Sequence, residues 1–187
     1  TLGRTILRLV NNNGGQIIYK GIDLGTLSTK ELRNYRKDMQ IVFQDPYSSL
    51  NPRLTVGEAI MEPMRVHNIL GSEEEQMNRV VELLVRVNMG KEHFYRYPHE
   101  FSGGQRQRIC IARSLALNPQ FIICDESVSA LDVSVQAQVL NLLNELRDEF
   151  NFTYIFISHD LSVVKFMADR MIVMTQGKIE EMGDADE

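Results

Sequence analysis

Cysteine, long apolar runs and basic clusters are all scarce in this sequence, and each scarcity excludes a class of protein. Only two of its 187 residues are cysteines, Cys110 and Cys124, and both lie in apolar stretches. No cysteine or histidine spacing of the zinc-binding type accompanies them. A disulfide scaffold and a zinc finger are therefore excluded, and both thiols are expected to be reduced core residues, as in a reducing compartment.

The rest of the composition is that of an ordinary globular domain. No apolar run approaches the ~20 residues that cross a bilayer. The formal net charge is −5, without a block of lysines and arginines, so nucleic acid is not an expected partner. With 43% hydrophobic and 24% charged residues, the chain can form one domain with a hydrophobic core.

The segment Phe-Ser-Gly-Gly-Gln-Arg-Gln-Arg at residues 101–108 predicts a helix that begins at an anion site. Ser102 and Gln105 have the spacing of a capping box. Gly103 and Gly104 allow backbone amides to approach a ligand without a side chain in the way. Helix N-termini attract phosphate, although a glycine loop that only starts a helix is an equally good interpretation of this segment alone.

A pair of acids follows a strand-length apolar run at Phe121–Cys124. Such a run is typical of a parallel strand buried on both faces, and ligands bind at the carboxyl edge of parallel sheets. Asp125 and Glu126 are expected at that edge, where one carboxylate can hold hydrated Mg²⁺ and the other can polarise an attacking water. An isolated pair of this kind would by default be two solvated acids.

Together with three further segments, these motifs resemble, in order, those of ATP-binding cassette (ABC) ATPases. Residues 101–105 are similar to the signature motif and residues 121–126 to the Walker B strand. Val42–Asp45 is similar to the Q-loop, and Ser129–Asp132 to the D-loop. His159, after the apolar run Thr153–Ile157, is similar to the switch histidine, whereas a lone histidine after a strand is more often an ordinary loop residue.

The resemblance covers nearly the whole chain and implies an α/β fold. That fold is the P-loop NTPase-type ABC nucleotide-binding domain, which has a RecA-like core and an inserted α-helical subdomain. The catalytic core is expected at about residues 1–44 and 119–187. The helical subdomain, which carries the signature motif, is expected at about residues 45–118.

The resemblance also implies a role for each catalytic residue, with ATP and Mg²⁺ as cofactors. Asp125 would hold Mg²⁺ through water, and Glu126 would be the general base for the attacking water. His159 would brace that water and the γ-phosphate. Gln44 would sense the γ-phosphate and Mg²⁺.

A second group of residues is implied to act across a dimer. Ser102, Gly103, Gly104 and Gln105 would cap the γ-phosphate of the nucleotide bound by the opposite subunit. Asp132 would help couple the two sites.

One family motif, the Walker A loop with its phosphate-binding lysine, has no counterpart in the chain. Residues 1–10 resemble the helix after that loop, with Leu2, Ile6, Leu9 and Val10 on one face and Thr1 just past the motif's lysine and serine. We therefore expect the N-terminal part of the domain to be missing, and this chain alone to bind Mg-ATP weakly or not at all.

Periodicity predicts the remaining elements. Strands are expected at Gln16–Tyr19, Met39–Phe43, Phe121–Cys124, Thr153–Ile157, Met171–Thr175 and Lys178–Met182. Capping boxes are expected at Ser28/Glu31, Thr55/Glu58, Ser72/Glu75 and Ser102/Gln105. Buried helical faces are expected at Val80, Leu83, Leu84 and Val87, and at Val139, Leu142, Leu143 and Leu146.

Residues 44–53 and 97–105 resemble the oligopeptide, dipeptide and nickel importer branch of the family. This implies a subunit that hydrolyses ATP to energise import, of peptides, from the cytoplasmic face of the cell membrane as a peripheral protein. The implied partners are a second ABC ATPase subunit, identical or different, transmembrane permease subunits and, indirectly, an extracytoplasmic solute-binding protein.

Two other interpretations remain open. The chain could belong to a soluble ABC ATPase of DNA repair or translation, or it could be a non-catalytic half that binds a partner ATPase. One residue also departs from the family pattern, since Ser127 replaces the proline that usually follows the Walker B glutamate. Proline stiffens a strand exit, so serine is expected to loosen Glu126 slightly.

Overall fold

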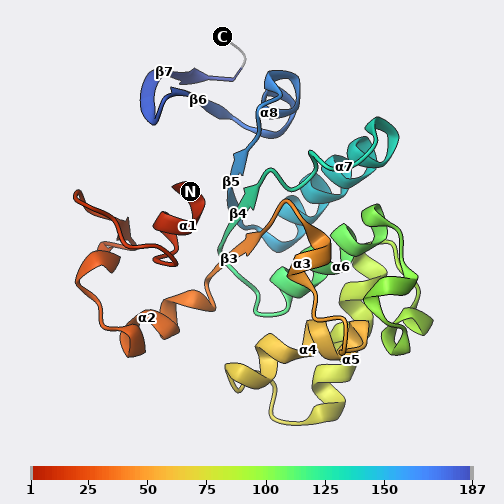
Figure 1. Cartoon of the computed structure of the whole chain (residues 1–187). Coiled ribbons are helices and arrows are strands. Elements are labelled where there is room, and N and C mark those ends of the chain that lie inside the picture. The colour runs from red at the N-terminus through yellow and green to blue at the C-terminus, as the bar shows by residue number, and fades with distance from the viewer. Residues whose placement is uncertain (1, 186–187) are drawn as a thin grey trace.

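The computed structural model describes residues 2–185, which form a small parallel sheet with helices on both sides and a hairpin beyond it (Figure 1). In chain order the elements are α1 (Leu2–Ile6), β1 (Ile18–Tyr19), β2 (Ile22–Asp23), α2 (Thr29–Arg36), β3 (Met39–Val42), α3 (Pro46–Ser49), α4 (Val56–Val66), α5 (Glu73–Arg86), α6 (Gly103–Leu115), β4 (Phe121–Asp125), α7 (Val133–Phe150), β5 (Thr153–Ile157), α8 (Leu161–Met167), β6 (Arg170–Thr175) and β7 (Lys178–Asp184). Short 3-10 helices span Leu24–Thr26, Lys91–Tyr95 and Pro98–Glu100.

The central sheet has the order β3-β4-β5, and both pairings are parallel. Val42 lies opposite Cys124, and Asp125 lies opposite Ile157. The loops that follow the three strands therefore leave the same edge of the sheet. The predicted Q-loop, Walker B acids and switch histidine all emerge there.

Both faces of β4 are covered, as its continuous apolar sequence predicts. On one face Ile123 belongs to a small cluster with Leu7, Leu24, Leu32 and Met39. On the other face Ile122 and Cys124 join a larger cluster that includes residues of α4, α5, α6 and α7. Because this larger core runs from the sheet into the helices, the boundary between catalytic core and helical subdomain remains a prediction.

The helices begin where the sequence predicts them to begin. Capping boxes are present at Ser28/Glu31, Thr55/Glu58, Ser72/Glu75 and Ser102/Gln105. The predicted apolar faces of α5 and α7 are buried, at Val80, Leu83, Leu84 and Val87 and at Val139, Leu142, Leu143 and Leu146. Local hydrogen bonds and apolar periodicity are thus enough to position these helices.

The prediction for residues 1–10 is wrong in its extent and in its face. Helix α1 ends at Ile6, and Arg8 adopts a left-handed conformation with φ 54°. Leu2, Leu9 and Val10 are exposed, whereas Gly3 is buried. Gly3 lies so close to the sheet that a Cβ there would be only 2.9 Å from Ile123 Cγ2. The helix therefore approaches the sheet through its glycine. Thr1, which the sequence places just past the Walker A lysine, lies outside the described residues.

The first predicted strand is also shorter than expected. Only Ile18–Tyr19 pairs, as one arm of a hairpin with Ile22–Asp23. Gly21 has φ 78°, a conformation that glycine adopts without strain. The turn therefore closes early and leaves two-residue arms.

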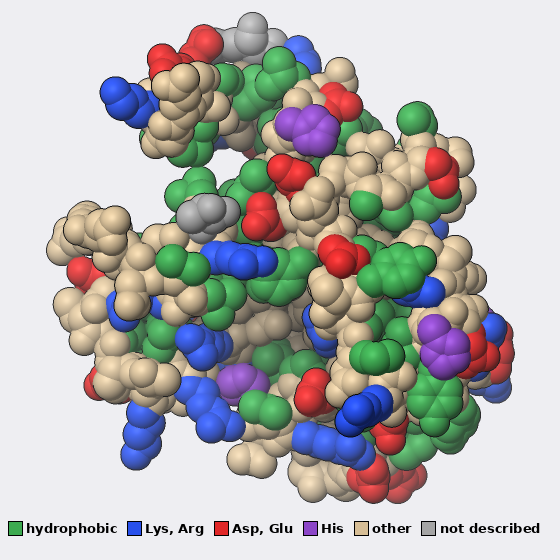
Figure 2. Space-filling view, viewed as in Figure 1, with side chains coloured by type: hydrophobic (Ala, Val, Ile, Leu, Met, Phe, Trp, Pro, Cys, Tyr) green, Lys and Arg blue, Asp and Glu red, His purple; other side chains and the backbone are tan. Residues whose placement is uncertain are grey.

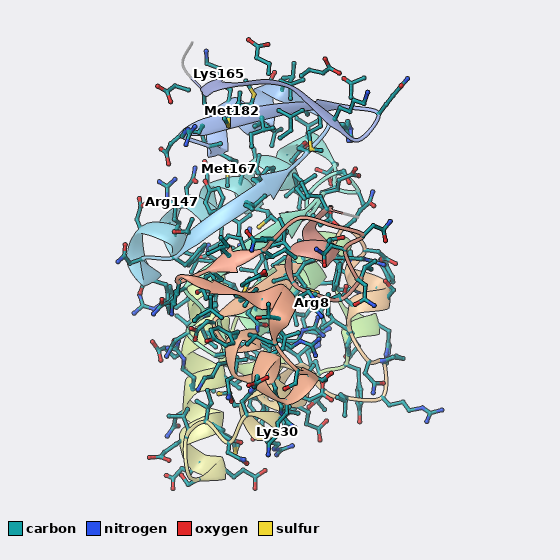
Figure 3. All side chains as sticks on the ribbon, turned by 90° about the vertical axis from the view of Figure 1, so that its left-hand side faces the viewer. Arg8, Lys30, Arg147, Lys165, Met167 and Met182 are labelled. Carbon is teal, nitrogen blue, oxygen red and sulfur yellow. The ribbon has the colours of Figure 1, made fainter. Side chains whose placement is uncertain are left out.

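The chain ends in an antiparallel hairpin that extends away from the central sheet. Ile172 pairs with Met182, and Met174 pairs with Ile179. These four side chains are exposed, so the hairpin has an uncovered apolar face. Figure 3 shows Lys165, Met167 and Met182 at this upper end of the molecule, with Arg8 and Lys30 in the lower half. Among residues 2–185, no helix is both long and apolar enough to cross a membrane.

Candidate active site

Three of the predicted site residues meet in one pocket of about 610 Å³ at the carboxyl edge of the sheet. Gln44 comes from the loop after β3, and Asp125 and Glu126 from the end of β4. The other lining residues are Arg4, Phe43, Asp45, Ser48, Ser49 and Arg113. Figure 2 shows acidic and basic side chains close together around the middle of this face. The pocket thus brings Gln44 of the Q-loop beside the two acids at one edge of the sheet.

The backbone of Glu126 is held firmly in an uncommon conformation. Its φ of 51° is left-handed, which costs energy for a residue with a side chain. The Glu126 amide donates to the Ile157 carbonyl at 3.0 Å, which continues the pairing of β4 with β5. Its carbonyl accepts from the Ser129 amide at 3.1 Å and from Ser129 Oγ at 3.0 Å. Backbone strain maintained by surrounding bonds is typical of functional sites.

Gln44 is held at both its backbone and its side chain. The fully buried Gln107 of α6 donates from Nε2 to the Phe43 carbonyl at 3.4 Å. Gln44 itself donates from Nε2 to Ser129 Oγ at 3.1 Å. The Q-loop is therefore connected to the helix of the signature motif on one side and to the D-loop on the other.

The next residue, Asp45, fixes the start of α3. Its carboxylate accepts from the backbone amides of Tyr47 at 2.8 Å and Ser48 at 3.3 Å. These hydrogen bonds, first that from Tyr47, lower the pKa of Asp45. Asp45 is thus committed to capping and is a poor candidate for a metal ligand.

The residues at the pocket fit a magnesium–nucleotide complex. Within residues 2–185 there is no group of three or more histidine, cysteine or acidic residues that could enclose a metal ion. Mg²⁺ does not require one, because it is usually held by one or two carboxylates together with waters and substrate phosphates. Asp125 forms no ion pair among the described residues, and the amide oxygen of Gln44 accepts no hydrogen bond from them. The Asp125 carboxylate and the Gln44 amide oxygen are therefore both available to a metal ion or its waters.

His159 lies at the same edge but outside this pocket. It is exposed and follows β5 by two residues, whereas the pocket is lined from α1, the loop after β3, α3, α6 and the end of β4. Its neighbour Asp160 caps α8 by accepting from the amides of Ser162 at 2.9 Å and Val163 at 3.3 Å. The cap fixes the loop on which His159 stands and leaves the imidazole free.

The four signature residues do not line the pocket of their own chain. Ser102 Oγ accepts from the Gln105 amide at 3.3 Å, and Gln105 Oε1 accepts from the Ser102 amide at 3.0 Å. A Cβ on Gly104 would lie 2.3 Å from Val135 Cγ1, whereas one on Gly103 would meet nothing closer than Leu131 at 3.8 Å. Gly104 is therefore required for packing within the chain, and Gly103 is not.

Asp132, the last predicted residue, caps α7. Its carboxylate accepts from the Val135 amide at 3.0 Å and from Ser134 Oγ at 2.8 Å. These bonds lower the pKa of Asp132, with the bond from the Val135 amide as the largest cause. The structure thus places Asp132 close to the signature helix through Val135, and away from the pocket that holds Asp125.

Several residues that line the pocket or hold its loops, Arg113 among them, were not predicted as site residues from the sequence. Arg4 lines the pocket with its guanidinium 5.4 Å from the centre of the Phe43 ring. Ser129 and Gln107 hold the Q-loop. Ser129 lay within the D-loop motif, which was a usable signal, but nothing in the local sequence marks Arg4 or Gln107 as neighbours of the pocket.

The structure also shows the surroundings of Ser127, the residue that replaces the usual proline after Glu126. Its side chain is buried, and its hydroxyl makes no regular hydrogen bond among the described residues. Burial raises the pKa of the adjacent Cys124 thiol to about 12, an effect that the nearby Ser127 hydroxyl only partly offsets. Burial likewise raises the pKa of Cys110 to about 11. Both cysteines are free and buried, as predicted.

Comparison with known proteins identifies the relatives of the chain. It is 55% identical over 183 residues to the glutathione import ATP-binding protein GsiA of Escherichia coli O157:H7, and 56% identical over the same length to that of Salmonella choleraesuis. These matches cover 98% of the chain but only 29% of either relative. The chain therefore spans less than a third of the length of these proteins.

Solved structures show the same fold. The dimeric ATP-binding cassette MJ0796 bound to ADP and Pi superposes with a TM-score of 0.83 at 29% identity, over 98% of this chain and 79% of that one. The cbiO1 protein of Clostridium perfringens, part of the ABC transporter complex cbiONQ, superposes with a TM-score of 0.86 at 27% identity, over 99% and 72%.

The family model described as ABC transporter matches residues 1–129, more than half of the chain. With the sheet order, the helices between β3 and β4 and the superpositions, this confirms the predicted α/β cassette fold. The chain belongs to the ABC transporter family.

Proposed function

We propose that the protein carrying this chain is the ATP-hydrolysing subunit of an ABC importer. The observation that carries the proposal is the convergence of Gln44, Asp125 and Glu126 on one pocket at the carboxyl edge of a parallel sheet. The relatives are named as ATP-binding proteins, and a structural neighbour binds ADP and Pi. Those names agree with the chemistry that these three side chains offer.

Each side chain has a distinct task in the proposed reaction. Asp125 would hold Mg²⁺ through water, and Gln44 would offer its amide oxygen to the same ion and so sense whether Mg²⁺ and the γ-phosphate are bound. Bound Mg²⁺ supplies charge neutralisation for the phosphates. Glu126 accepts a proton from the attacking water, and His159, on the loop that the Asp160 cap fixes after β5, braces that water and the γ-phosphate.

We further propose that each complete site is shared by two subunits. Ser102, Gly103, Gly104 and Gln105 would cap the γ-phosphate bound by the opposite subunit, and Asp132 would couple the two sites. In support, the signature residues do not line the pocket of their own chain, and Gly103, unlike Gly104, is not required for packing within the chain. The structural neighbours include a dimeric cassette.

The test is Glu126→Gln in the full-length protein. A positioned base is worth about 10²–10⁴ in rate, so ATP turnover should fall on that order while ATP binding persists. Since binding energy from both half-sites is available only in the closed dimer, ATP should trap a dimer that gel filtration detects. Turnover at the wild-type rate would remove Glu126 from this role.

The imported solute is proposed to be a small peptide or a peptide-like molecule. The curated relatives are named for import of glutathione, which is itself a tripeptide. The proposed partners are a second ABC ATPase subunit, membrane permease subunits and, indirectly, an extracytoplasmic solute-binding protein, with this subunit peripheral at the cytoplasmic face. Uptake of labelled peptides by the reconstituted transporter is the direct test, and stimulation of ATPase activity only by a non-peptide solute would contradict the substrate.

A second groove lies between the segment that follows α1, the strand β3 and the helix α4. This groove, of about 290 Å³, has an apolar floor that includes Leu7, Met39 and Ile41. Arg36 and His67 also line it, and burial followed by the charges of Arg33 and Lys37 lowers the pKa of His67. Copurification of the full-length protein with DNA or ribosomes, and not with permease subunits, would instead favour a non-transport ABC ATPase.

The domain division stays part of the proposal. Residues 1–44 and 119–187 would form the catalytic core, and residues 45–118 the helical subdomain. The phosphate-binding loop of the Walker A type is not among the 187 residues. Full activity therefore requires a protein that supplies that loop together with this chain.

A further inference from the structure

We infer that Ser129 is a positioning residue that decides which end of the Gln44 side-chain amide faces the metal ion. The inference deepens the proposed function and rests on it, because it concerns the same pocket. It begins with one hydroxyl group and the two groups that it contacts.

The Ser129 hydroxyl has one proton, and the chemistry of its neighbours assigns that proton to one of them. Oγ lies 3.0 Å from the Glu126 carbonyl oxygen, which can only accept. The proton is therefore used there, and Oγ has only lone pairs to offer to a second partner. That partner is the Gln44 amide at 3.1 Å.

A lone pair selects the nitrogen end of an amide. The two ends of a glutamine side chain have nearly the same shape and differ mainly in whether they donate or accept. Because Ser129 can only accept from Gln44, Nε2 must face Ser129, and Oε1 is the end left uncommitted. Oε1 is also the end that can bind Mg²⁺. Within residues 2–185, Gln44 has no other side-chain hydrogen bond that would impose this choice.

The backbones on both sides of this bond are fixed. The Phe43 carbonyl is held by Gln107, whose side chain is fully buried. The Glu126 amide is held by the Ile157 carbonyl at 3.0 Å. A hydroxyl anchored on the backbone of the proposed base therefore sets the orientation of the proposed metal ligand.

Removing the Ser129 hydroxyl is expected to have the effect of removing a hydrogen bond that orients a metal ligand. Removing such a partner of a metal ligand costs about 10–100-fold in metal affinity or activity. In Ser129→Ala the amide can turn, so metal affinity should fall by about tenfold. Ser129→Thr keeps the hydroxyl and should retain most of the affinity.

The experiment measures the binding of Mn²⁺, which is used in place of Mg²⁺. Binding is followed by electron paramagnetic resonance in the presence of ATP. The full-length protein carries Glu126→Gln, so that hydrolysis does not contribute to the readout. Ser129→Ala, Ser129→Thr, Gln44→Ala and Asp125→Ala are compared with the control Ser134→Ala. The Ser134 hydroxyl donates instead to Asp132 Oδ1 at 2.8 Å. Circular dichroism verifies that each variant is folded.

The inference is supported if Ser129→Ala weakens Mn²⁺ binding by about tenfold, if Ser129→Thr and Ser134→Ala do not, and if adding Ser129→Ala to Gln44→Ala causes no further loss. It is overturned, with the proposed function intact, if Gln44→Ala weakens Mn²⁺ binding but Ser129→Ala does not. Should neither Gln44→Ala nor Asp125→Ala weaken it, the metal site in the proposed function itself would fail.

Discussion

At the scale of single residues, the two glycines of the signature motif have different physical reasons to lack a side chain. Gly104 faces Val135 at a distance that excludes even a methyl group, whereas a methyl group on Gly103 would make only an ordinary contact with Leu131 at 3.8 Å. A motif that looks uniform in sequence thus combines a packing requirement with a surface available to a ligand.

Gly104→Ala is therefore expected to destabilise the fold and Gly103→Ala is not. An added methyl group in a packed region costs about 1–3 kcal/mol, because Val135 or the helix must move. Urea unfolding should show this loss for Gly104→Ala, and Val135→Ala in the same chain should restore much of it. Equal stability of both glycine variants would mean that the approach of α6 to α7 is looser than the structure shows. In the full-length protein, Gly103→Ala should instead weaken ATP-driven dimerisation.

Ser127 permits a second residue-scale prediction. A buried hydroxyl without a regular hydrogen bond costs free energy, since it has lost its water partners. Ser127→Ala is expected to leave the free energy of unfolding unchanged or to raise it by about 1 kcal/mol. The matched control is Ser114→Ala, because Ser114 is also buried but donates to the Ile111 carbonyl at 2.7 Å. Ser114→Ala should lose stability, and a comparable loss in Ser127→Ala would mean that the contact of the Ser127 hydroxyl with the Cys124 thiol stabilises the fold.

At the scale of elements, the carboxylates that cap helices make the stability of the fold depend on pH. Hydrogen bonds at a helix start, first that from the Val135 amide, hold the pKa of Asp132 below its ordinary value of 3.8. A depressed pKa in the folded state means stability that is present above the ordinary pKa and lost as pH falls through the folded pKa. The hydrogen bond from the Thr55 amide likewise lowers the pKa of the capping glutamate Glu58. The stability that Glu58 contributes is therefore also lost as pH falls.

The variant Asp132→Asn keeps a side chain that can cap α7 but removes its charge. Asparagine caps about as well as aspartate, so the melting temperature near pH 7 should change little. Below about pH 4 the wild-type protein should lose stability more steeply than the variant, because only the wild type must bind a proton at this cap. Melting curves between pH 7 and pH 3 make the comparison. Parallel curves would show that the cap contributes equally when protonated.

Elements also show what the sequence can and cannot predict. Strands β4 and β5, the four capping boxes and the shared edge of Gln44 with Asp125 follow from local patterns. The bonds that set the site geometry do not, because Gln44 and Ser129 are 85 residues apart and Gln107 and Phe43 are 64 apart. Helix α1 was misjudged for a related reason, since the close approach of Gly3 to Ile123 outweighed the apolar periodicity. His159 reaches the predicted edge but does not line the pocket.

At the scale of the whole molecule, the pocket provides carboxylates and an amide but little that would hold phosphates. Arg4 and Arg113 line it, and neither is part of a glycine-rich loop of backbone amides. In P-loop proteins that loop, with its lysine, makes the principal contacts to the phosphates. A pocket dominated by Asp125, Glu126 and Gln44 should repel free phosphate and bind a nucleotide only when such a loop completes it.

Calorimetric titration of Mg-ATP into residues 1–187 alone is therefore expected to give no stoichiometric heat. Circular dichroism must first show the helix content of the fold, and the full-length protein, which is expected to bind, is the positive control. Clear stoichiometric binding by residues 1–187 would mean that Gln44, Asp125 and Glu126, with Arg4 and Arg113, suffice to hold the nucleotide. In that case Asp125→Ala should abolish the heat, because the pocket would depend on the metal ion to attract the phosphates.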